Sequence, residues 1–255
     1  MMIHVKKLAL AAMITVLCLG LSVTYADLTE GLVGYWSLDE GNGKEIAEGT
    51  GKDHVGTFVA GNPKWVDGKF SKGLEFDGLS DVEIPDHDDF HLVEAVSVAL
   101  WAKPDGAQAD WGKFFIKQKS GEYPYSLQYD DGQAIFATVH ASARFDTAPK
   151  LPTFKEWAHL AFVYAGDGLF LYKNGEEIAK NEQATGDLQQ NELSLSIGGR
   201  LNSGQDFKGT IDEVYLYNRE LSVNEIKLLM EGHEKAFAVA PGGKLAVTWG
   251  DLKSR

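Results

Sequence analysis

Short runs of alternating hydrophobic and polar residues, separated by turn-forming residues, follow one another along most of this chain. In residues 191–200, NELSLSIGGR, two leucines and an isoleucine occupy alternate positions and serines lie between them. A period of two is typical of a β-strand with one buried face. Strands that recur every 8–12 residues or so, without long helical segments between them, favour an all-β sandwich or barrel.

Glycine-containing dipeptides predict where the strands turn back. Asn174-Gly175 lies between LFLYK and EEIAK, and Asp131-Gly132 lies between YSLQY and QAIFATVH. Both pairs suit the type I′ turn, which needs two residues that tolerate positive φ. The sequence therefore predicts antiparallel hairpins at these points.

One short helix is predicted near the C-terminus. Ser222 and Glu225 match a capping box, in which each side chain accepts one free backbone N–H at the helix start. Gly232 can adopt the left-handed conformation that ends a helix. We expect residues 233–255 to be a tail with a Pro-Gly-Gly turn, formed by two short strands or a flexible arm. Its Trp249 could dock a partner.

The first 26 residues have the pattern of a secretory signal peptide. Lys6 and Lys7 precede an apolar run that ends at Val23, and Ala26 closes a small-residue cleavage pattern. A membrane anchor is the alternative, but ~16 apolar residues are short for a span of ~30 Å. The expected organisation is a signal peptide over 1–26, one exported domain over 27–232, and the tail. No window after residue 26 is apolar enough to span a bilayer.

Cysteine content and charge exclude several classes of function. The only cysteine, Cys18, lies in the signal segment, so the exported part would have no disulfide and no thiolate metal site. The formal net charge is −13, and removal of Lys6 and Lys7 makes it more negative. Such a chain repels nucleic acid and anionic membranes, which favours neutral ligands or hard cations as partners.

Several motifs, in their order along the chain, resemble one family. They are GLVGYWSLDEGNG, FSKGLEFDGLSDVEIP, SVALWAKP, EWAHLAFVY and FKGTIDEVYLYNRELSVNEI, and they run from about Gly31 to about Leu229. This set resembles the laminin-G-like, concanavalin A-like jelly-roll modules of bacterial secreted proteins. The resemblance implies two antiparallel sheets packed face to face, a concave face that related lectins and glycanases use for sugars, and a calcium site on the opposite side in many members.

The resemblance also implies which residues hold the calcium. Asp212, in TIDEVYLYN, matches an aspartate in the last strand of related laminarinases and lichenases, and Asp39 lies at the matching early position. Strict alternation would put Asp212 on one face with two aliphatic residues, where a carboxylate needs a partner or a cation. Backbone or Arg219 hydrogen bonds to Asp212 are the alternative. Glu213, on the other face, is expected to face solvent.

The sequence does not support a glycanase. Such enzymes place acids with a period of two on one strand, so that the outer pair act as nucleophile and acid/base. Glu75-Phe76-Asp77 begins this pattern, but Gly78-Leu79-Ser80 follows and no second glutamate arrives in register. We therefore expect no enzyme activity.

The histidines do not match a recognisable metal motif. Residues 85–92, PDHDDFHL, contain three acids and two histidines, and we expect a solvated loop there, with a cation site as the alternative. The histidines at positions 54, 87, 91, 140 and 233 show no ligand spacing. His159 alternates with Trp157 and Ala161, which favours a hydrogen-bonded structural role.

Binding is the function that remains. Trp111, Tyr123 and Tyr125 lie in the stretch richest in mixed aromatic and polar residues and are candidates for a platform on which sugars stack, although aromatic residues also fill sandwich cores. We predict a non-catalytic module that binds glycans or glycoproteins and holds a structural Ca²⁺. The alternative is a protein–protein adhesion or cell-surface scaffold domain that binds no sugar and has other surface proteins as partners.

Overall fold

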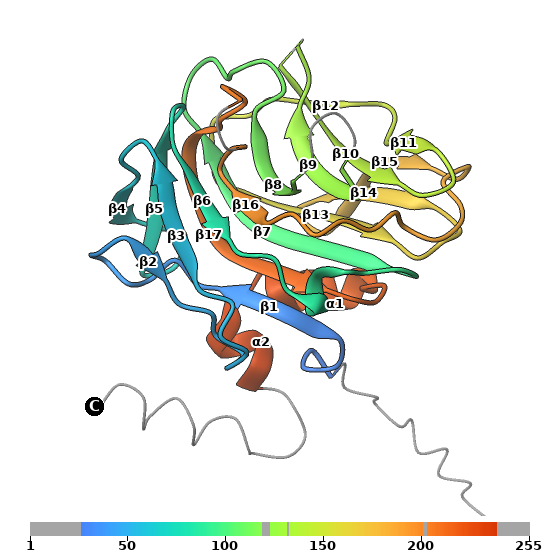
Figure 1. Ribbon diagram of the computed structural model, residues 1–255, viewed down its shortest axis with the longest axis horizontal. Coiled ribbons are helices and arrows are strands. Elements are labelled where there is room, and N and C mark those ends of the chain that lie inside the picture. The colour runs from blue at the N-terminus through green and yellow to red at the C-terminus, as the bar shows by residue number, and fades with distance from the viewer. Residues whose placement is uncertain (1–26, 119–122, 132, 201–202, 239–255) are drawn as a thin grey trace, which may run out of the picture.

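The chain folds into two antiparallel sheets that pack face to face, as the computed structural model shows (Figure 1). The structure describes residues 27–118, 123–131, 133–200 and 203–238. The all-β jelly-roll class predicted from the sequence is confirmed. The predicted signal segment, Gly132 and the tail from residue 239 onward, with Trp249, lie outside the described residues.

Sheet A has eight strands, in the order β15-β14-β13-β7-β17-β5-β4, with β1 paired to β17. The last strand in sequence therefore lies inside the sheet and also pairs with the first. The Asn174-Gly175 turn between β14 and β15 has positive φ at both residues, as the hairpin prediction required. The strands are β1 (Leu32–Trp36), β4 (Lys64–Asp67), β5 (Lys72–Asp77), β7 (Val96–Pro104), β13 (Ala158–Tyr164), β14 (Leu169–Lys173), β15 (Glu176–Asn181) and β17 (Lys208–Tyr217).

Sheet B has nine strands, in the order β11-β10-β9-β8-β16-β6-β3-β2, with β12 paired to β10. A short 3₁₀ helix, η1 (Asp88–Phe90), leads from β6 back to sheet A. The strands of sheet B are β2 (Glu45–Ile46), β3 (Gly56–Ala60), β6 (Asp81–Ile84), β8 (Lys113–Lys117), β9 (Tyr125–Tyr129), β10 (Ala134–His140), β11 (Arg144–Asp146), β12 (Leu151–Pro152) and β16 (Leu195–Ile197).

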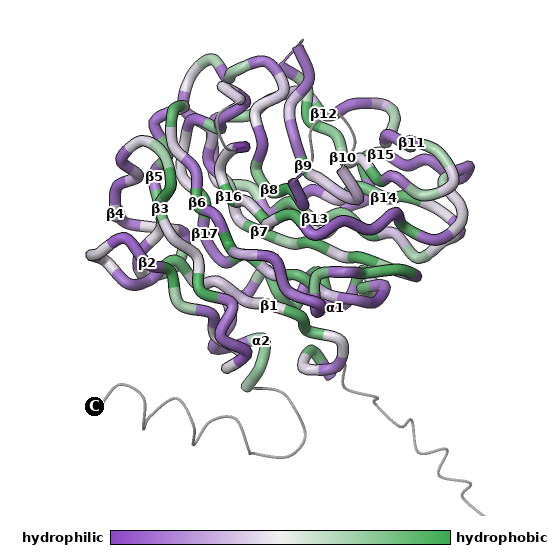
Figure 2. Tube along the Cα trace, viewed as in Figure 1, coloured by the Kyte–Doolittle hydropathy of each residue, from purple (hydrophilic) through white to green (hydrophobic). Residues whose placement is uncertain are grey.

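The main hydrophobic core fills the space between the sheets. Alternation along each strand directs one set of side chains inward, and Figure 2 shows hydrophobic positions concentrated in the strands and hydrophilic ones mostly in the loops. Burial of each large apolar side chain stabilises the fold by roughly 1.5–3 kcal/mol. Members of this core from both sheets include Trp36, Leu100, Phe115, Leu127, Phe162 and Leu216.

A second hydrophobic cluster covers the outer face of sheet A. The helices α1 (Val223–Leu229) and α2 (His233–Ala238) lie against this face (Figure 1). The capping box of Ser222 and Glu225 starts α1 as predicted, and Gly232, with φ 84°, separates the two helices. The cluster includes Tyr35, Ala161, Tyr215, Leu221, Ile226 and Leu229.

Helix α2 lies where a tail was expected from residue 233 onward, so that expectation was wrong for residues 233–238. His233 stacks on Tyr35, with ring centroids 4.0 Å apart, and on Phe237, at 4.2 Å. The sequence of α2, HEKAFA, contains good helix formers, but six residues are too few for a stable isolated helix, so these tertiary contacts order it. Of the helices in the described part of the chain, none has the length and apolarity needed to cross a bilayer.

Candidate functional site

The outer face of sheet B carries a row of mostly polar side chains across neighbouring strands. The register places Glu83 beside Ser196, Ser196 beside Ile116, and Ile116 beside Ser126. The strand neighbours of Glu83, Ser196 and Ser126 all belong to the core between the sheets. The row therefore faces away from that core, on the face that α1 and α2 do not cover.

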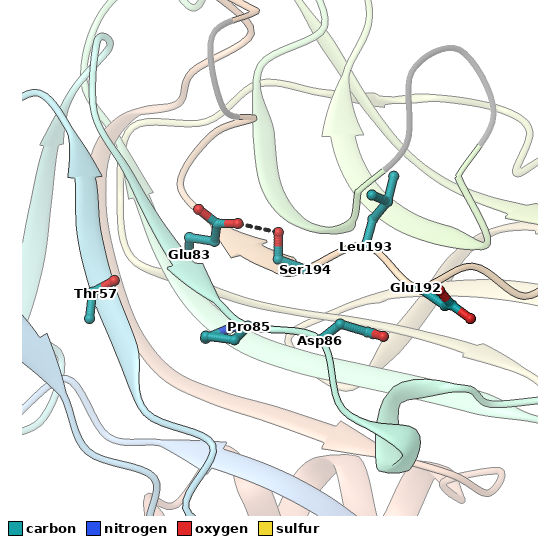
Figure 3. A pocket seen from close by; sticks show the side chains of 7 residues that line it. All are labelled: Thr57, Glu83, Pro85, Asp86, Glu192, Leu193 and Ser194. Atoms are coloured by element: carbon teal, nitrogen blue, oxygen red, sulfur yellow. Dashed lines mark hydrogen bonds between the residues drawn. The ribbon is translucent and has the colours of Figure 1, made fainter.

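A hollow of about 390 Å³ lies at one end of this row (Figure 3). Carboxylates, hydroxyls and one exposed leucine form its lining, which consists of Thr57, Glu83, Pro85, Asp86, Glu192, Leu193 and Ser194. Ser194 Oγ donates a hydrogen bond of 2.5 Å to Glu83 Oε1 across the hollow (Figure 3). These groups are well suited to hydrogen bonding with a polyhydroxylated ligand.

Asp86 is held in place at the edge of the hollow. Lys117 Nζ donates to Asp86 and to the backbone oxygen of Leu193, and His91 Nε2 lies 3.0 Å from Asp86 Oδ2. Burial alone would raise the pKa of Asp86, but the hydrogen bonds with Lys117 and His91 outweigh it and hold the pKa below its usual value. Asp86 is therefore a charged acceptor at neutral pH.

Asp81 lies two residues before Glu83 on β6 and also points to the outer face, but it is fully buried. Burial and the nearby Asp206 carboxylate raise the pKa of Asp81 to about 6. Its Oδ1 has no hydrogen-bond partner among the described residues. Glu75 and Asp77, the acids considered from the sequence, lie on β5 of the other sheet, whereas the Asp81-x-Glu83 alternation on β6 was not recognised. The polar–apolar alternation of DVEI was the signal that could have found it.

Lys113 occupies the middle of the same face and is buried. Its Nζ donates to Gln128 Oε1. The Tyr123 hydroxyl also contacts the Gln128 amide, at 2.9 Å from Oε1 and 2.7 Å from Nε2. Burial lowers the pKa of Lys113 to about 7, with repulsion from Arg200 and Arg144 adding to the effect. Within the part of the chain that the structure describes, no carboxylate pairs with this amine. The centre of this face thus holds a buried amine that is only partly protonated at neutral pH.

The three aromatic residues predicted to form a sugar-stacking platform do not form one. Tyr125 is fully buried in the core and donates to the backbone oxygen of Phe90, so its assignment was wrong. Alternation along β9 directs it inward with Leu127. Tyr123 is also buried, with its hydroxyl in the Gln128 network. Trp111 alone is partly exposed, with its ring set edge-on to Phe136.

Asp212 lies on the outer face of sheet A. A β-bulge between Asp212 and Tyr215 breaks the alternation, so Asp212 is aligned with Trp101 and His159 rather than with the aliphatic residues that follow it. The strict alternation assumed from the sequence was wrong here. Burial raises the pKa of Asp212 to about 8, and repulsion from Glu213 and Asp39 contributes.

Backbone N–H groups in the turn between β4 and β5, and at the start of β5, donate hydrogen bonds to both predicted calcium ligands. Asp212 Oδ2 accepts from the backbone N–H groups of Lys69 (2.7 Å) and Phe70 (2.9 Å), and the exposed Asp39 accepts from that of Lys72 (2.8 Å). Asp212 Oδ1 is buried without a partner among the described residues, which fits a position for a cation ligand. Arg219 pairs with Glu225 instead of Asp212.

Glu213 is buried, so the expectation that it faces solvent was wrong. Its φ of 53° belongs to the bulge, which turns the side chain under α2. It accepts hydrogen bonds from Tyr35 OH (2.8 Å), Tyr215 OH (2.5 Å) and the backbone N–H of His233 (3.0 Å). The two adjacent acids thus accept hydrogen bonds from different segments: Asp212 from the β4–β5 turn, and Glu213 from β1, β17 and α2.

Comparisons with known proteins agree with this architecture. A family model described as the concanavalin A-like lectin/glucanases superfamily matches residues 76–227. Domain 4 of an extracellular arabinanase from Geobacillus stearothermophilus, solved in complex with arabinotriose, is 25% identical with a TM-score of 0.63, over 77% of this chain and 96% of that chain.

Two further structures share the fold at lower identity. The binding domain of Paraclostridial Mosquitocidal Protein 1 is 13% identical with a TM-score of 0.64, over 80% of this chain and 52% of that chain. A Trypanosoma rangeli sialidase in complex with the inhibitor DANA is 17% identical with a TM-score of 0.58, over 80% of this chain and 33% of that chain. No curated protein matches the chain.

Proposed function

This chain belongs to the concanavalin A-like lectin/glucanases superfamily, and from that premise we propose that it is an exported, non-catalytic module that binds glycans on the outer face of sheet B. The observation that carries the proposal is the polar hollow beside Glu83, Asp86 and Ser194, on the sheet face that the helices leave uncovered. The arabinanase domain supports it, because that domain aligns over nearly its whole length and was solved with an oligosaccharide.

The lining of the hollow favours a neutral sugar. Glu83 and Asp86 can accept hydrogen bonds from ligand hydroxyls, and a charged acceptor makes such bonds stronger than a neutral one does. Thr57 and Ser194 can both donate and accept, while Leu193 offers apolar surface. An anionic sugar would be repelled by the carboxylates that line this hollow. Glycans on proteins or in polysaccharides are therefore the partners that we propose.

The charge states of the acids support a binding role over glycoside hydrolysis. A glycanase needs two carboxyl groups about 5–10 Å apart, one of which keeps its proton near neutral pH. In the hollow, the pKa of Asp86 is lowered, which makes it a poor proton donor. Asp81 has a pKa raised to about 6, but it is fully buried and out of reach of a ligand in the hollow.

We also propose that Asp212 and Asp39 hold a structural calcium ion. Asp212 Oδ1 would supply one ligand and Asp39 another. Calcium takes about six to eight oxygen ligands, and backbone carbonyls and water would supply the others. The ion would supply the positive charge that lets Asp212 stay ionised in a buried place. It would thereby fix the turn between β4 and β5 to the central strand β17.

A glycan array with the purified protein tests the proposed function. The parent is expected to bind a defined set of neutral oligosaccharides, and Glu83→Gln to weaken binding more than tenfold, because it replaces a charged acceptor. Glu75→Gln is the matched control, since Glu75 is an exposed acid of sheet A. A folded protein that binds no glycan, with calcium or with EDTA, would contradict the proposal and favour the protein-binding alternative.

A further inference from the structure

Two histidines and an aspartate meet at the rim of sheet B, outside the hollow. His54 precedes β3, whereas His87 is the N-cap of η1 and Asp89 lies within it. One ligand atom from each of the three lies within 4.8 Å of the other two. The segments are far apart in sequence, so no spacing pattern could reveal the cluster.

His54 is a buried imidazole with unused nitrogens. Its residue is 3% exposed, and neither ring nitrogen has a hydrogen-bond partner among the described residues. The ring is fixed between Phe90 and His87, with centroid distances of 4.5 and 4.7 Å, and its backbone oxygen accepts from Trp36 Nε1 at 2.9 Å. The fold therefore holds a neutral nitrogen ligand in a defined position.

The carboxylate of Asp89 lies between the two imidazoles. Its Oδ2 is 3.5 Å from His54 Nε2, and its Oδ1 is 3.7 Å from His87 Nδ1. That same His87 nitrogen accepts the backbone N–H of Asp89 at 3.1 Å, so a metal bound at this atom would replace that N-cap bond. The Asp89 and His87 side chains are partly exposed, which leaves the site open to solvent on one side.

We propose that His54, His87 and Asp89 form a binding site for a borderline divalent transition cation, best matched by Zn²⁺. Zinc takes nitrogen and carboxylate ligands in tetrahedral sites with bonds of about 2.0–2.2 Å, which places neighbouring ligand atoms about 3.3–3.6 Å apart. The measured separations of 3.5 and 3.7 Å are close to this spacing, so metal binding needs small side-chain rotations and the exchange of the His87 N-cap bond for a metal bond. Calcium, by contrast, prefers oxygen ligands alone.

Lys52 is the built-in competitor for this cation. Its Nζ lies 3.6 Å from Asp89 Oδ2 and also donates to the backbone oxygen of Leu32 at 3.0 Å. The ammonium group balances the Asp89 charge when no metal is bound. When a metal binds Asp89, Lys52 can leave the carboxylate and keep its hydrogen bond to the backbone oxygen of Leu32. Removal of this charge should therefore strengthen metal binding. The site uses none of the residues that line the hollow, so it is independent of the proposed function.

Calorimetric titration of the tag-free, EDTA-stripped protein with ZnCl₂ tests the proposal. We expect one Zn²⁺ per chain, more than tenfold weaker binding in His87→Gln and in Asp89→Asn, and a few-fold tighter binding in Lys52→Gln. His91→Gln is the matched control, because His91 lies in the same segment but pairs with Asp86. CaCl₂ should give no heat that depends on His87.

Two results would overturn the proposal: a folded parent that does not bind Zn²⁺, or an equal loss of affinity in His87→Gln and His91→Gln. His87 and Asp89 carry the test because their side chains are partly exposed, whereas a change at the buried His54 could disturb folding. Thermal unfolding with and without Zn²⁺ provides the second measurement. Zinc should raise the melting temperature of the parent and of His91→Gln, but not that of His87→Gln.

Discussion

The outer faces of the two sheets use polar side chains in opposite ways. On sheet A, Glu213 is buried beneath α2 and Asp212 beneath the β4–β5 turn, and both Glu213 oxygens and Asp212 Oδ2 accept hydrogen bonds from the protein itself. On sheet B, Glu83 and Asp86 line a hollow that opens to solvent. The same residue types thus connect segments of the fold on one face and remain available to a ligand on the other.

The buried acids of sheet A should affect the stability of the fold, whereas the acids at the hollow of sheet B should affect ligand binding. A buried acceptor that satisfies several donors leaves all of them unpaired when it is removed, and each unpaired group costs about 1–3 kcal/mol. A partly exposed acid at the surface can exchange its partner for water. Substitutions of the buried acids on sheet A should therefore change the free energy of unfolding, whereas those of the partly exposed acids at the hollow of sheet B should not.

The largest effect is expected for Glu213→Ala. It leaves the hydroxyls of Tyr35 and Tyr215 and the N–H of His233 without their acceptor. We expect a loss of about 3–5 kcal/mol in the free energy of unfolding, measured by urea denaturation. Glu220→Ala, at an exposed acid just beyond β17, is the control and should change stability by less than about 0.5 kcal/mol. A loss below about 1 kcal/mol for Glu213→Ala would show that α2 does not depend on this carboxylate.

The next effect concerns the proposed calcium. At a calcium concentration of 100 times the Kd, bound calcium adds about 2.7 kcal/mol of stability, which corresponds to roughly 5–10 °C in melting temperature for a domain of this size. Asp212→Ala should erase that rise. Differential scanning calorimetry with calcium and with EDTA is the measurement. A parent protein whose melting is indifferent to EDTA would refute the calcium site and leave Asp212 as a hydrogen-bond acceptor for the β4–β5 turn.

His159 should make the fold sensitive to acid. It is fully buried on sheet A, with neither ring nitrogen partnered among the described residues, and burial lowers its pKa to about 3. The unfolded chain binds a proton at about pH 6.5 that the folded state does not bind, so stability falls as the pH drops from about 6.5 towards 3. This amounts to about 2 kcal/mol at pH 5.

Urea denaturation at pH 7 and pH 5 checks that effect. His159→Leu should unfold with a smaller difference between the two pH values than the parent shows. His87→Gln, at a partly exposed histidine, is the control and should retain the parent's difference. An unchanged difference in His159→Leu would mean that other groups cause the loss at low pH.

The smallest effect on stability is expected for Lys113→Met on sheet B. Burial lowers the pKa of Lys113 to about 7, so the folded state releases a proton that the unfolded state keeps up to about pH 10.5. Stability of the parent should therefore rise with pH between about 7 and 10, and that rise should vanish in the variant. Gln128 keeps Tyr123 as a partner, so at pH 7 we expect no loss, or a gain of about 1 kcal/mol. A clear loss would mean that this face is as structural as sheet A.

Local patterns in the sequence predicted the parts of the fold that depend on local physics. The Asn174-Gly175 turn and the Ser222–Glu225 capping box are each set within a few residues, and both are present. The ordered motifs identified the family. The bulge at Glu213 could not be predicted by alternation, because one residue of left-handed backbone moves Asp212 to the outer face, where Glu213 also lies.

The candidate sites were harder to predict because they are assembled from distant segments. Tyr125 and Trp111 lie close together in an aromatic stretch, yet one fills the core and the other remains partly exposed. His54 and His87 meet only because β3 pairs with β6, which brings the segment before one strand beside the segment after the other. Spacing rules cannot detect such a pair without the topology.

The central position of β17 has a consequence for the order of events during synthesis. This strand lies between β7 and β5 and also pairs with β1, and Glu213 on it reaches Tyr35 across 178 residues of chain. A growing polypeptide thus presents unpaired strand edges until β17 has been made, and such edges can associate with other chains. Sheet A can therefore be completed only after β17 has left the ribosome, and until then its open edges depend on chaperones for protection.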